Sequence, residues 1–453
     1  MDGQSYVSST LERIKQISPG QTVFLQAATE ILNSLQPLLD KESKYHKHRI
    51  LDRIVMPERT TMFRVTYIND KGEACPHFGY RVQFSSAIGP YKGGLRFHPS
   101  VNLDVIKFLG FEQIFKNSLT GLSMGGAKGG ANFDPKGKSD SEIMRFCQAF
   151  MLELQTVIGD VIDVPAGDIG VGGREIGYLF GQYKKITRRF DGALTGKGLN
   201  WGGSLVRTEA TGYGLIYFAM EMLAKNNASL EGKTCVISGA GNVAIYACEK
   251  LYQIGAKPVT VSDSTGYIYD KDGIDVELLK RLKEVERVGL QNYTKERVNA
   301  KFTPVSAYPA GRNGVWDVPC DAAFPCATQN ELNLEDIKVL YNNGCRLLAE
   351  GANMPSTLDA MKFMSEKSDF LYGPAKAANA GGVATSGLEM SQNAGMLKWS
   401  FEKVDQELQN IMKHIFDISY ETSVEFGKPG DLVLGGNIAG FRKVADAMID
   451  QGY

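Results

Sequence analysis

Apolar residues recur along the chain with two different spacings, and the change between them marks the first structural elements. From Met62 to Tyr67 apolar and polar residues alternate, and they alternate again from Phe78 to Phe84, after the turn-rich segment 69–72. Both runs predict strands, paired antiparallel. Helical spacing returns over 103–119. A helix is also predicted near the N-terminus from the spacing of Val23, Phe24, Ala27, Ala28, Ile31, Leu32 and Leu35.

Further along, strands and helices follow one another in a regular order. The segment 139–142 resembles a capping box and predicts a helix that carries Ile143, Phe146, Phe150 and Leu154. A new unit begins near Trp201. Strands are predicted at 234–238, 258–263, 321–327 and 345–350, with helical segments between them, the first running to about Ile254. This rhythm predicts a parallel sheet wound by helices. The tail, about 399–448, is helical again.

These patterns predict an α/β protein of two domains. The first is an α/β domain with a mixed sheet at 1–200, joined by about 425–453 from the tail. The second is a Rossmann-like domain at 201–424. The C-terminal helices are expected to pack back on the first domain. A chain of 453 residues is long enough for two such domains.

Composition excludes several classes of function. The formal net charge of -1 provides no field that would draw the chain to nucleic acid or membrane. No apolar run is long enough to span a bilayer, and residues 1–5 lack the pattern of a signal peptide. The seven cysteines form no CxxC pair, which favours buried thiols in a reducing compartment, the cytoplasm. The five histidines form no metal signature, so no metal is expected.

A glycine motif suggests a nucleotide site. The segment 239–244, GAGNVA, follows a predicted strand and opens a predicted helix. In such a motif Gly239 allows the tight turn, Gly241 lets a pyrophosphate approach the backbone, and Ala244 keeps helix and sheet close. The helix N-terminus favours the phosphates. The alternative is a structural turn that binds nothing.

The choice between NAD and NADP stays open at this level. Asp263 ends the second strand, where an acid usually holds the ribose 2′-hydroxyl of NAD. Ser262 and Ser264 flank it and can hydrogen-bond a phosphate. Positive charge can come from elsewhere, from Lys136, Lys138 or Arg287.

Lys128 lies within four glycines, in the run 125–130. Glycines at such density allow either a sharp turn or a very close approach of the backbone. A lysine held there loses water, and desolvation and nearby positive charge lower its pKa toward the range of a usable base. A solvated lysine in a surface turn is the alternative. The run is not a Walker loop, because no Ser or Thr follows the lysine.

Other polar residues share this setting. Lys92 precedes two glycines and Asp168 stands between Gly167 and Ile169-Gly170. Gln113 and Lys116 are three residues apart and share a helix face. Each alone fits a surface side chain or a cap, but together they indicate a site for a small ligand.

Four segments resemble glutamate dehydrogenase over nearly the whole chain: 90–99 (PYKGGLRFHP), 125–130 (GGAKGG), 164–168 (VPAGD) and 376–383 (KAANAGGV). The length and the absence of a long insertion before the tail resemble the short hexameric form. The resemblance implies a first domain for substrate binding and oligomerisation, and a homohexamer. The implied substrates are 2-oxoglutarate, ammonium and L-glutamate.

The resemblance also implies residue roles. Lys128 would act on the water that attacks an imine, with its pKa lowered by the charges of Lys92 and Lys116, and Asp168 would relay protons to and from the amino nitrogen. Lys92 and Ser386 would bind the side-chain carboxylate, and Lys116, Gln113 and the Gly167 backbone the α-carboxylate. The pocket wall would be formed by Asn379, Gly382 and Val383. The cofactor would contact Thr211, Ser238, Gly239, Gly241, Asn242, Val243, Asp263, Ser264, Thr328, Asn353 and Lys136.

By resemblance of 261–264 and 134–138, NADP is favoured over NAD. The expected function is therefore NADP-dependent reductive amination of 2-oxoglutarate. The alternatives are an NAD-dependent catabolic enzyme of the same kind, and a non-catalytic nucleotide-responsive binding protein on the same scaffold.

Overall fold

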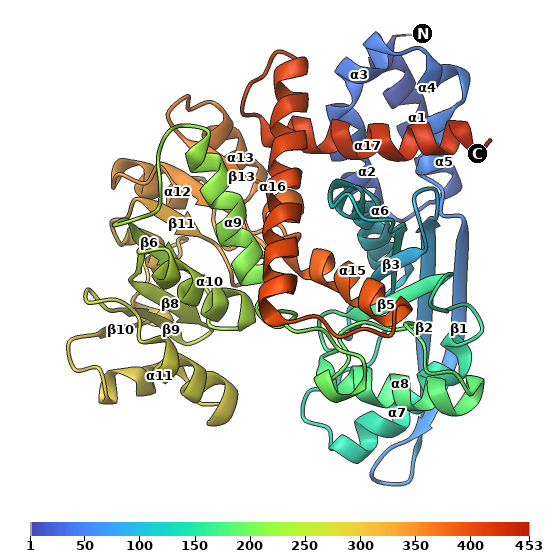
Figure 1. Ribbon diagram of the computed structural model, residues 1–453, viewed down its shortest axis with the longest axis horizontal. Helices are drawn as coiled ribbons and strands as arrows, with labels where there is room; N and C mark the ends of the chain where they lie inside the picture. Colours follow the sequence, from blue (N-terminus) through green and yellow to red (C-terminus); the bar gives the residue numbers. More distant parts are fainter. Residues whose placement is uncertain (1, 453) are drawn as a thin grey trace. The chain divides into compact units, whose positions relative to one another are not determined.

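A computed structural model describes residues 2–452 as two compact units. One unit comprises the chain up to Arg207, the segment Val383–Val404 and the end of the chain from Leu434; the other comprises Thr208–Gly382 and Asp405–Val433. Figure 1 traces the chain through its helices and strands. The segment 383–404 was predicted within the second domain, but it belongs to the N-terminal unit. It does so because its side chains bond there, as Gln392 does with the Ser204 hydroxyl at 2.8 Å.

The N-terminal unit is built on a five-stranded mixed sheet, in the order β1-β2-β4-β3-β5. The first three strands in this order pair antiparallel, and β4, β3 and β5 pair parallel. The predicted mixed sheet and the predicted antiparallel pair are thus confirmed. The strands are β1 (Arg59–Ile68), β2 (Ala74–Ser85), β3 (Tyr91–Phe97), β4 (Gly126–Ala131) and β5 (Asp163–Gly167).

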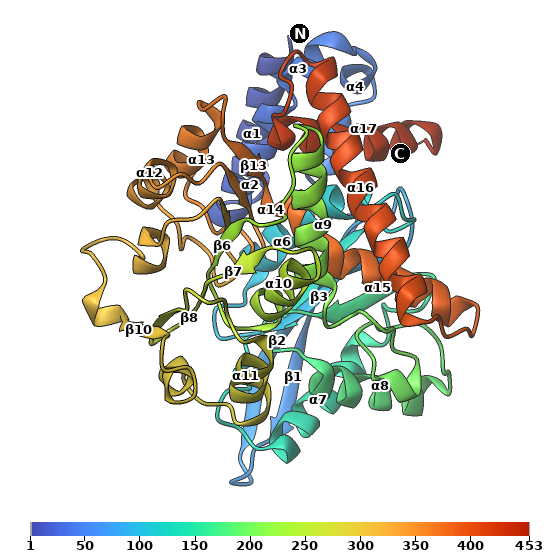
Figure 2. The same ribbon diagram turned by 60° about the vertical axis from the view of Figure 1, so that its left-hand side comes forward.

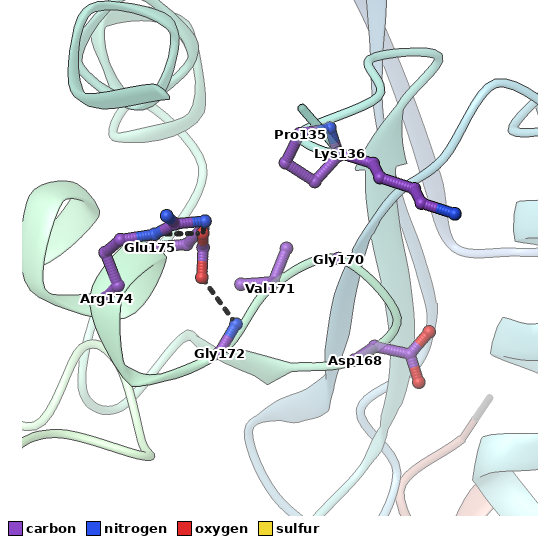
Figure 3. Close-up of a pocket in the computed structure, with 8 residues that line it drawn as sticks. All are labelled: Pro135, Lys136, Asp168, Gly170, Val171, Gly172, Arg174 and Glu175. Atoms are coloured by element: carbon purple, nitrogen blue, oxygen red, sulfur yellow. Dashed lines mark hydrogen bonds and ion pairs between the residues drawn. The ribbon is translucent and has the colours of Figure 1, made fainter. Parts of the chain in front are cut away.

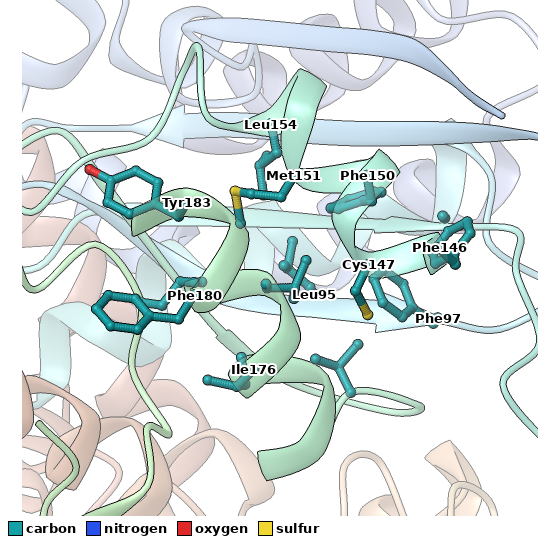
Figure 4. Packing of buried hydrophobic residues seen from close by; sticks show 14 of the residues in the cluster. Leu95, Phe97, Phe146, Cys147, Phe150, Met151, Leu154, Ile176, Phe180 and Tyr183 are labelled. Carbon is teal, nitrogen blue, oxygen red and sulfur yellow. The ribbon is translucent and has the colours of Figure 1, made fainter. Parts of the chain in front are cut away.

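Helices cover both faces of this sheet. On one face α7 (Asp140–Leu154) and α8 (Gly173–Thr187) enclose an aromatic core that includes Phe146 and Phe150 (Figure 4). The Phe133 and Phe146 rings are stacked there, with their centroids 3.7 Å apart. On the other face α6 (Leu103–Leu119) packs against the sheet, and α2 (Thr22–Ser34) packs on α6. Burial of such large aromatic side chains supplies much of the stabilisation of a unit of this kind.

The predicted capping box of α7 forms only in part. The Ser139 hydroxyl accepts from the Glu142 amide at 3.1 Å, as a helix cap does. The Glu142 carboxylate does not return to the cap, because it accepts from the Tyr67 hydroxyl at 2.8 Å and from Lys138 at 2.9 Å.

The C-terminal helix α17 (Leu432–Asp450) packs on the N-terminal helices, as predicted. The Tyr45 hydroxyl donates to Asp446 at 3.0 Å, and the Asn437 amide donates to the Ser34 hydroxyl at 3.0 Å. The remaining helices of this unit are α1 (Gly3–Ile17), α3 (Gln36–Lys41), α4 (Lys44–Lys47), α5 (Ile50–Ile54), α15 (Gly381–Ala394, which begins in the other unit) and the 3₁₀ turn Leu199–Trp201.

The other unit contains the predicted parallel sheet, with helices α9, α10, α12 and α13 around it (Figure 2). Its order is β13-β12-β11-β6-β7. The strands are β6 (Thr234–Ile237), β7 (Lys257–Pro258), β11 (Ala322–Phe324), β12 (Leu347–Ala349) and β13 (Leu371–Gly373). The helices are α9 (Ala210–Ala224), α10 (Asn242–Gln253), α11 (Val276–Lys280, continued by a π turn to Val285), α12 (Leu334–Asn342), α13 (Leu358–Ser365), α14 (Ala375–Ala378) and α16 (Phe401–Glu425), with 3₁₀ turns at Leu290–Lys295, Val305–Ala307 and Gly314–Asp317.

The strand predicted at 258–263 is divided in two. Only β7 joins the parallel sheet, whereas β8 (Thr260–Asp263) pairs antiparallel with β9 (Gly266–Tyr269), which pairs with β10 (Lys301–Pro304). The reason lies in Thr260, whose hydroxyl accepts from the Ile237 amide and donates to the Ile237 carbonyl, both at 2.9 Å. A side chain thus replaces the backbone ladder between β6 and β8.

Within residues 2–452, no helix combines the length and the apolar character that crossing a membrane requires. All seven cysteines are free thiols, and all but Cys75 are buried. In the same described part of the chain, no group of His, Cys, Asp and Glu side chains is arranged to hold a metal ion.

Candidate functional site

Lys128 projects from the middle of β4, a buried strand. A methyl group added at Gly126 would lie 2.8 Å from the Ile114 amide nitrogen, so only glycine lets α6 approach the strand this closely. The glycine run therefore allows the close approach of a helix to a strand, and it does not form a sharp turn. The run therefore fixes Lys128 between a sheet and a helix.

Lys128 is paired with the second predicted catalytic residue. Its Nζ lies 3.1 Å from Asp168 Oδ1, and Arg96 Nε donates to Asp168 Oδ2 at 2.7 Å. Burial alone would raise the pKa of Asp168, but Lys128 and Arg96 outweigh it and hold that pKa below its ordinary value. The structure therefore places an ionised carboxylate between two cations.

Burial lowers the pKa of Lys128 most, and the Asp168 carboxylate offsets part of that effect. The cations that lower the Lys128 pKa further are chiefly Arg96 and Arg81, not Lys92 and Lys116, which were predicted for this role from the sequence. Arg96 acts on Lys128 because both side chains bond to the Asp168 carboxylate, whereas the Lys92 ammonium bonds to the Val164 carbonyl and the Thr195 hydroxyl. Lys116 is affected in turn: burial and the charge of Lys128 lower its pKa to about 8.

A second polar cluster surrounds Lys92, which is 0% exposed. Its Nζ donates to the Val164 carbonyl at 3.0 Å and to the Thr195 hydroxyl at 2.6 Å, and that hydroxyl shares a hydrogen bond with Ser386. The structure thus brings Lys92 and Ser386 together around Thr195, although Ser386 lies far away in the sequence. A lysine and two hydroxyls form a suitable receptor for a carboxylate.

The residues predicted for a second carboxylate lie on α6 and β5. Gln113 and Lys116 lie on α6, where the Gln113 amide donates to Asn117 at 2.7 Å. Gly167 ends β5 beside Asp168. An open groove of about 430 Å³ adjoins this region, and it is lined by Asp168, Lys136 and the Arg174–Glu175 ion pair (Figure 3).

The glycine motif of the other unit has the geometry of a nucleotide loop. Gly239 has a φ of +84° and follows Ser238 at the end of β6, and α10 begins at Asn242, followed by Val243. A methyl group at Gly241 would meet no atom within 4 Å, so the helix N-terminus opens on free space. No side chain caps this helix, which leaves its first amides available to an anion.

Asp263 does not present a free carboxylate. It accepts from the Thr265 amide at 2.9 Å and from Lys283 Nζ at 3.0 Å. These donors lower the pKa of Asp263 against the opposing effect of burial. Ser264 beside it is exposed, as is Arg287. A neutralised acid beside an exposed serine suits a 2′-phosphate better than a 2′-hydroxyl.

The other predicted residues fall in both units. Asn379 donates to Asn353 Oδ1 at 2.9 Å and to the Ala352 carbonyl at 3.1 Å, so these two asparagines are neighbours. Thr211 lies in the first turn of α9, and the Thr328 amide donates to Glu331 at 3.1 Å. Gly382 is the last residue of the segment Thr208–Gly382 of the second unit. Val383 is the first residue of the segment Val383–Val404 of the N-terminal unit.

Four residues at these sites were not found from the sequence. Thr195 lies in a loop without any periodic pattern, so no local signal marks it. Lys283 lies 20 residues beyond Asp263, in a π turn. Arg96 stands two residues after Gly94, within a segment that was recognised, but it was assigned no role. The fourth, Asp163, pairs with Arg81, and both are completely buried.

Two further acids of this unit are Glu350, which is buried, and Glu331, which is half-buried. The Glu350 carboxylate accepts from the Ala375 amide at 2.9 Å, and Glu331 accepts from the Ala327 amide at 2.9 Å. Burial raises the pKa of each to about 7, and the charge of Glu350 adds to the effect on Glu331.

These acids predict a pH-dependent stability. Because the pKa of Glu350 rises from 4.5 to about 7 on folding, the folded state binds more protons, and this contribution to stability is lost as pH rises toward 7. Glu350→Gln should therefore raise the melting temperature by about 2–4 °C at pH 8 and give no gain at pH 4.5. Thermal unfolding followed by circular dichroism measures both values. A gain of equal size at both values of pH would contradict the assignment.

Two family models match the chain. The model described as Glutamate/Leucine/Phenylalanine/Valine dehydrogenase matches residues 202–452. The model described as Glu/Leu/Phe/Val dehydrogenase, dimerisation domain, matches residues 57–185.

Individual relatives match over nearly the whole chain. The NADP-specific glutamate dehydrogenase of Helicobacter pylori is 62% identical, over 99% of this chain and 100% of that protein. The NAD-specific glutamate dehydrogenase of Bacteroides fragilis is 51% identical, over 98% and 99%. Among solved structures, glutamate dehydrogenase of Plasmodium falciparum superposes with a TM-score of 0.96 at 52% identity, over 100% of this chain and 95% of that one.

Proposed function

Because the chain belongs to the glutamate, leucine, phenylalanine and valine dehydrogenase family, we propose that it interconverts 2-oxoglutarate and L-glutamate by NADP-dependent reductive amination. The observation that carries the choice of substrate is the buried cluster of Lys92, Thr195 and Ser386. A buried cation with two hydroxyls favours a side-chain carboxylate over the apolar side chains of leucine, phenylalanine or valine.

The two carboxylates of the substrate are held at two places. Lys92 and Ser386 bind the distal carboxylate, and Lys116, Gln113 and the Gly167 backbone bind the α-carboxylate. Two anchors fix the orientation of the five-carbon chain, which places its Cα and its nitrogen at a defined position. Asn379, Gly382 and Val383 form the wall of the pocket.

Lys128 and Asp168 handle the protons. Burial lowers the pKa of Lys128, which favours its action as the base that takes a proton from the water that attacks the imine. Asp168, held ionised by Lys128 and Arg96, exchanges protons with the amino nitrogen. Their contact at 3.1 Å lets a proton pass between the two side chains.

The nicotinamide cofactor, when bound, accepts or supplies the hydride at the substrate Cα. The residues of the second unit fit such a group, because Gly241 faces open space and the N-terminus of α10 is uncapped. Ser238, Gly239, Asn242 and Val243 would contact its phosphates. Thr211 and Asn353 would orient its nicotinamide end, and Thr328 would lie near the ribose. Ser264 and Lys136 would meet the 2′-phosphate.

The pairing of Asp263 with Lys283 predicts a cofactor-switch variant. Lys283→Ala removes the ammonium that neutralises Asp263 at 3.0 Å, which leaves a carboxylate free to repel a phosphate and to accept from a ribose hydroxyl. The ratio of kcat/KM for NADPH to that for NADH should fall by about tenfold or more. Initial rates with both cofactors measure this ratio. Lys280→Ala is the matched control, because Lys280 pairs with Glu249 and Glu277 instead, and its ratio should stay that of the wild type.

The proposed reaction is tested by the absorbance of the reduced nicotinamide. With 2-oxoglutarate, ammonium and NADPH, the absorbance should fall only when all three are present, and NADH at equal concentration should react more slowly. A clear preference for NADH would favour the NAD-dependent alternative. No reaction with either cofactor would favour a nucleotide-binding protein without catalysis.

Assembly and location belong to the same proposal. The match of 57–185 to a dimerisation-domain model supports self-association, and we propose a homohexamer. Seven free thiols favour a reducing compartment, the cytoplasm.

A further inference from the structure

A buried acid lies behind the Lys92 cluster. Glu389 is on α15, three residues after Ser386, and its side chain is 0% exposed. Its carboxylate accepts from the Gly196 amide at 2.9 Å and forms an ion pair with Lys197 Nζ at 3.0 Å. Because Gly196 follows Thr195 directly, these bonds tie the loop that carries the Thr195 hydroxyl to the helix that carries Ser386.

The charges around Lys92 are unbalanced without this acid. Arg81, Lys197 and Arg207 all disfavour a positive charge on Lys92. Arg81 is neutralised by Asp163 at 2.8 Å. Glu389 is the leading acid that acts on Lys197, with a smaller contribution from Asp191, and it is the acid that acts on Arg207. The guanidinium of Arg207 relies on the Glu389 charge in particular, because the buried Arg207 Nε has no hydrogen-bond partner within residues 2–452.

We infer that Glu389 is a positioning residue that neutralises Lys197 beside the Lys92 cluster and holds Thr195 against Lys92, so that the pocket accepts the distal carboxylate of a diacid. This inference rests on the proposed function, since it takes Lys92 as the anchor of that carboxylate. Burial lowers the pKa of Lys92, and the Glu389 carboxylate is the leading influence that raises it. A neutral lysine would have no charge to offer a carboxylate.

The test is the pH dependence of inhibition by glutarate, a five-carbon diacid without an oxo or amino group. Glu389→Gln should weaken glutarate binding by about tenfold or more at alkaline pH and move the loss of binding to lower pH. Lys197→Met removes a cation instead and should move that loss to higher pH. The double variant should return toward the wild type, because the two opposing charges are removed together. In Glu389→Gln the KM for 2-oxoglutarate should rise more than kcat falls.

Asp270→Asn is the matched control, because Asp270 is an equally buried acid, paired with Arg297 at 2.9 Å in the other unit. It should leave the pH dependence unchanged. The inference would be overturned if Glu389→Gln and Lys197→Met both moved the pH dependence of glutarate inhibition in the same direction, or if neither variant moved it. If Glu389→Gln does not fold, the direction of the Lys197→Met shift decides. A wild-type protein that neither turns over 2-oxoglutarate nor binds glutarate would instead refute the proposed function.

Discussion

Replacing Lys128 by alanine should lower kcat for glutamate oxidation by about 10³-fold or more, with a much smaller change in KM. The lysine is fixed in β4, where its Nζ lies 3.1 Å from the Asp168 carboxylate. Initial rates across a range of glutamate concentrations separate the two constants. Asp168→Asn should show the same pattern, because it removes the acceptor of the proton.

Lys107→Ala is the matched control for the loss of a buried lysine. Lys107 also lies on the α6 side of the sheet, and burial lowers its pKa to about 8, but its Nζ donates to Ser18 at 2.8 Å and Gln21 at 3.0 Å. Its removal can lower the melting temperature without a comparable loss of kcat. Turnover in Lys128→Ala within about threefold of the wild type would reject the catalytic assignment.

The second large effect is a change of substrate. In Lys92→Leu with Ser386→Val, the buried cation and one hydroxyl are replaced by apolar side chains, so the distal carboxylate loses its partners. We expect kcat/KM for glutamate to fall by about 10³-fold or more, and activity with leucine, valine or norvaline to become measurable. Cofactor reduction with each amino acid measures both changes.

Each single variant serves as the control for the double one. Lys92→Leu alone leaves two hydroxyls, Thr195 and Ser386, without their cation, and should therefore lose glutamate activity without accepting apolar amino acids well. Unchanged glutamate turnover in the double variant would show that the distal carboxylate binds elsewhere.

The overall architecture was largely predictable because many of its elements have clear hydrophobic periods. Strands β1 and β2 alternate, and α6 shows helical spacing over its whole length. The strands β3, β4 and β5, which form the parallel part of the sheet, were not predicted as strands. Both of their faces are covered, so their apolar residues do not alternate, and their glycines have low strand propensity.

The site was only partly predictable from patterns in the residues themselves. The glycine setting identified Lys128 and Asp168 as unusual, but their roles came from the resemblance to a family. Thr195 meets Lys92 and Ser386 only through the fold, because a loop, a strand and a helix meet there. Asp263 was recognised as an acid at a strand end, whereas its neutralisation by Lys283 depends on a π turn that no sequence pattern marks.

The most direct test of the assigned chemistry is a crystal structure with L-glutamate and NADP bound. We expect the distal carboxylate to contact Lys92 Nζ and Ser386 Oγ, the α-carboxylate to contact Lys116, and the amino nitrogen to lie beside Lys128 and Asp168. A structure in which Lys128 points into solvent, or in which glutamate binds away from Lys92, would contradict it.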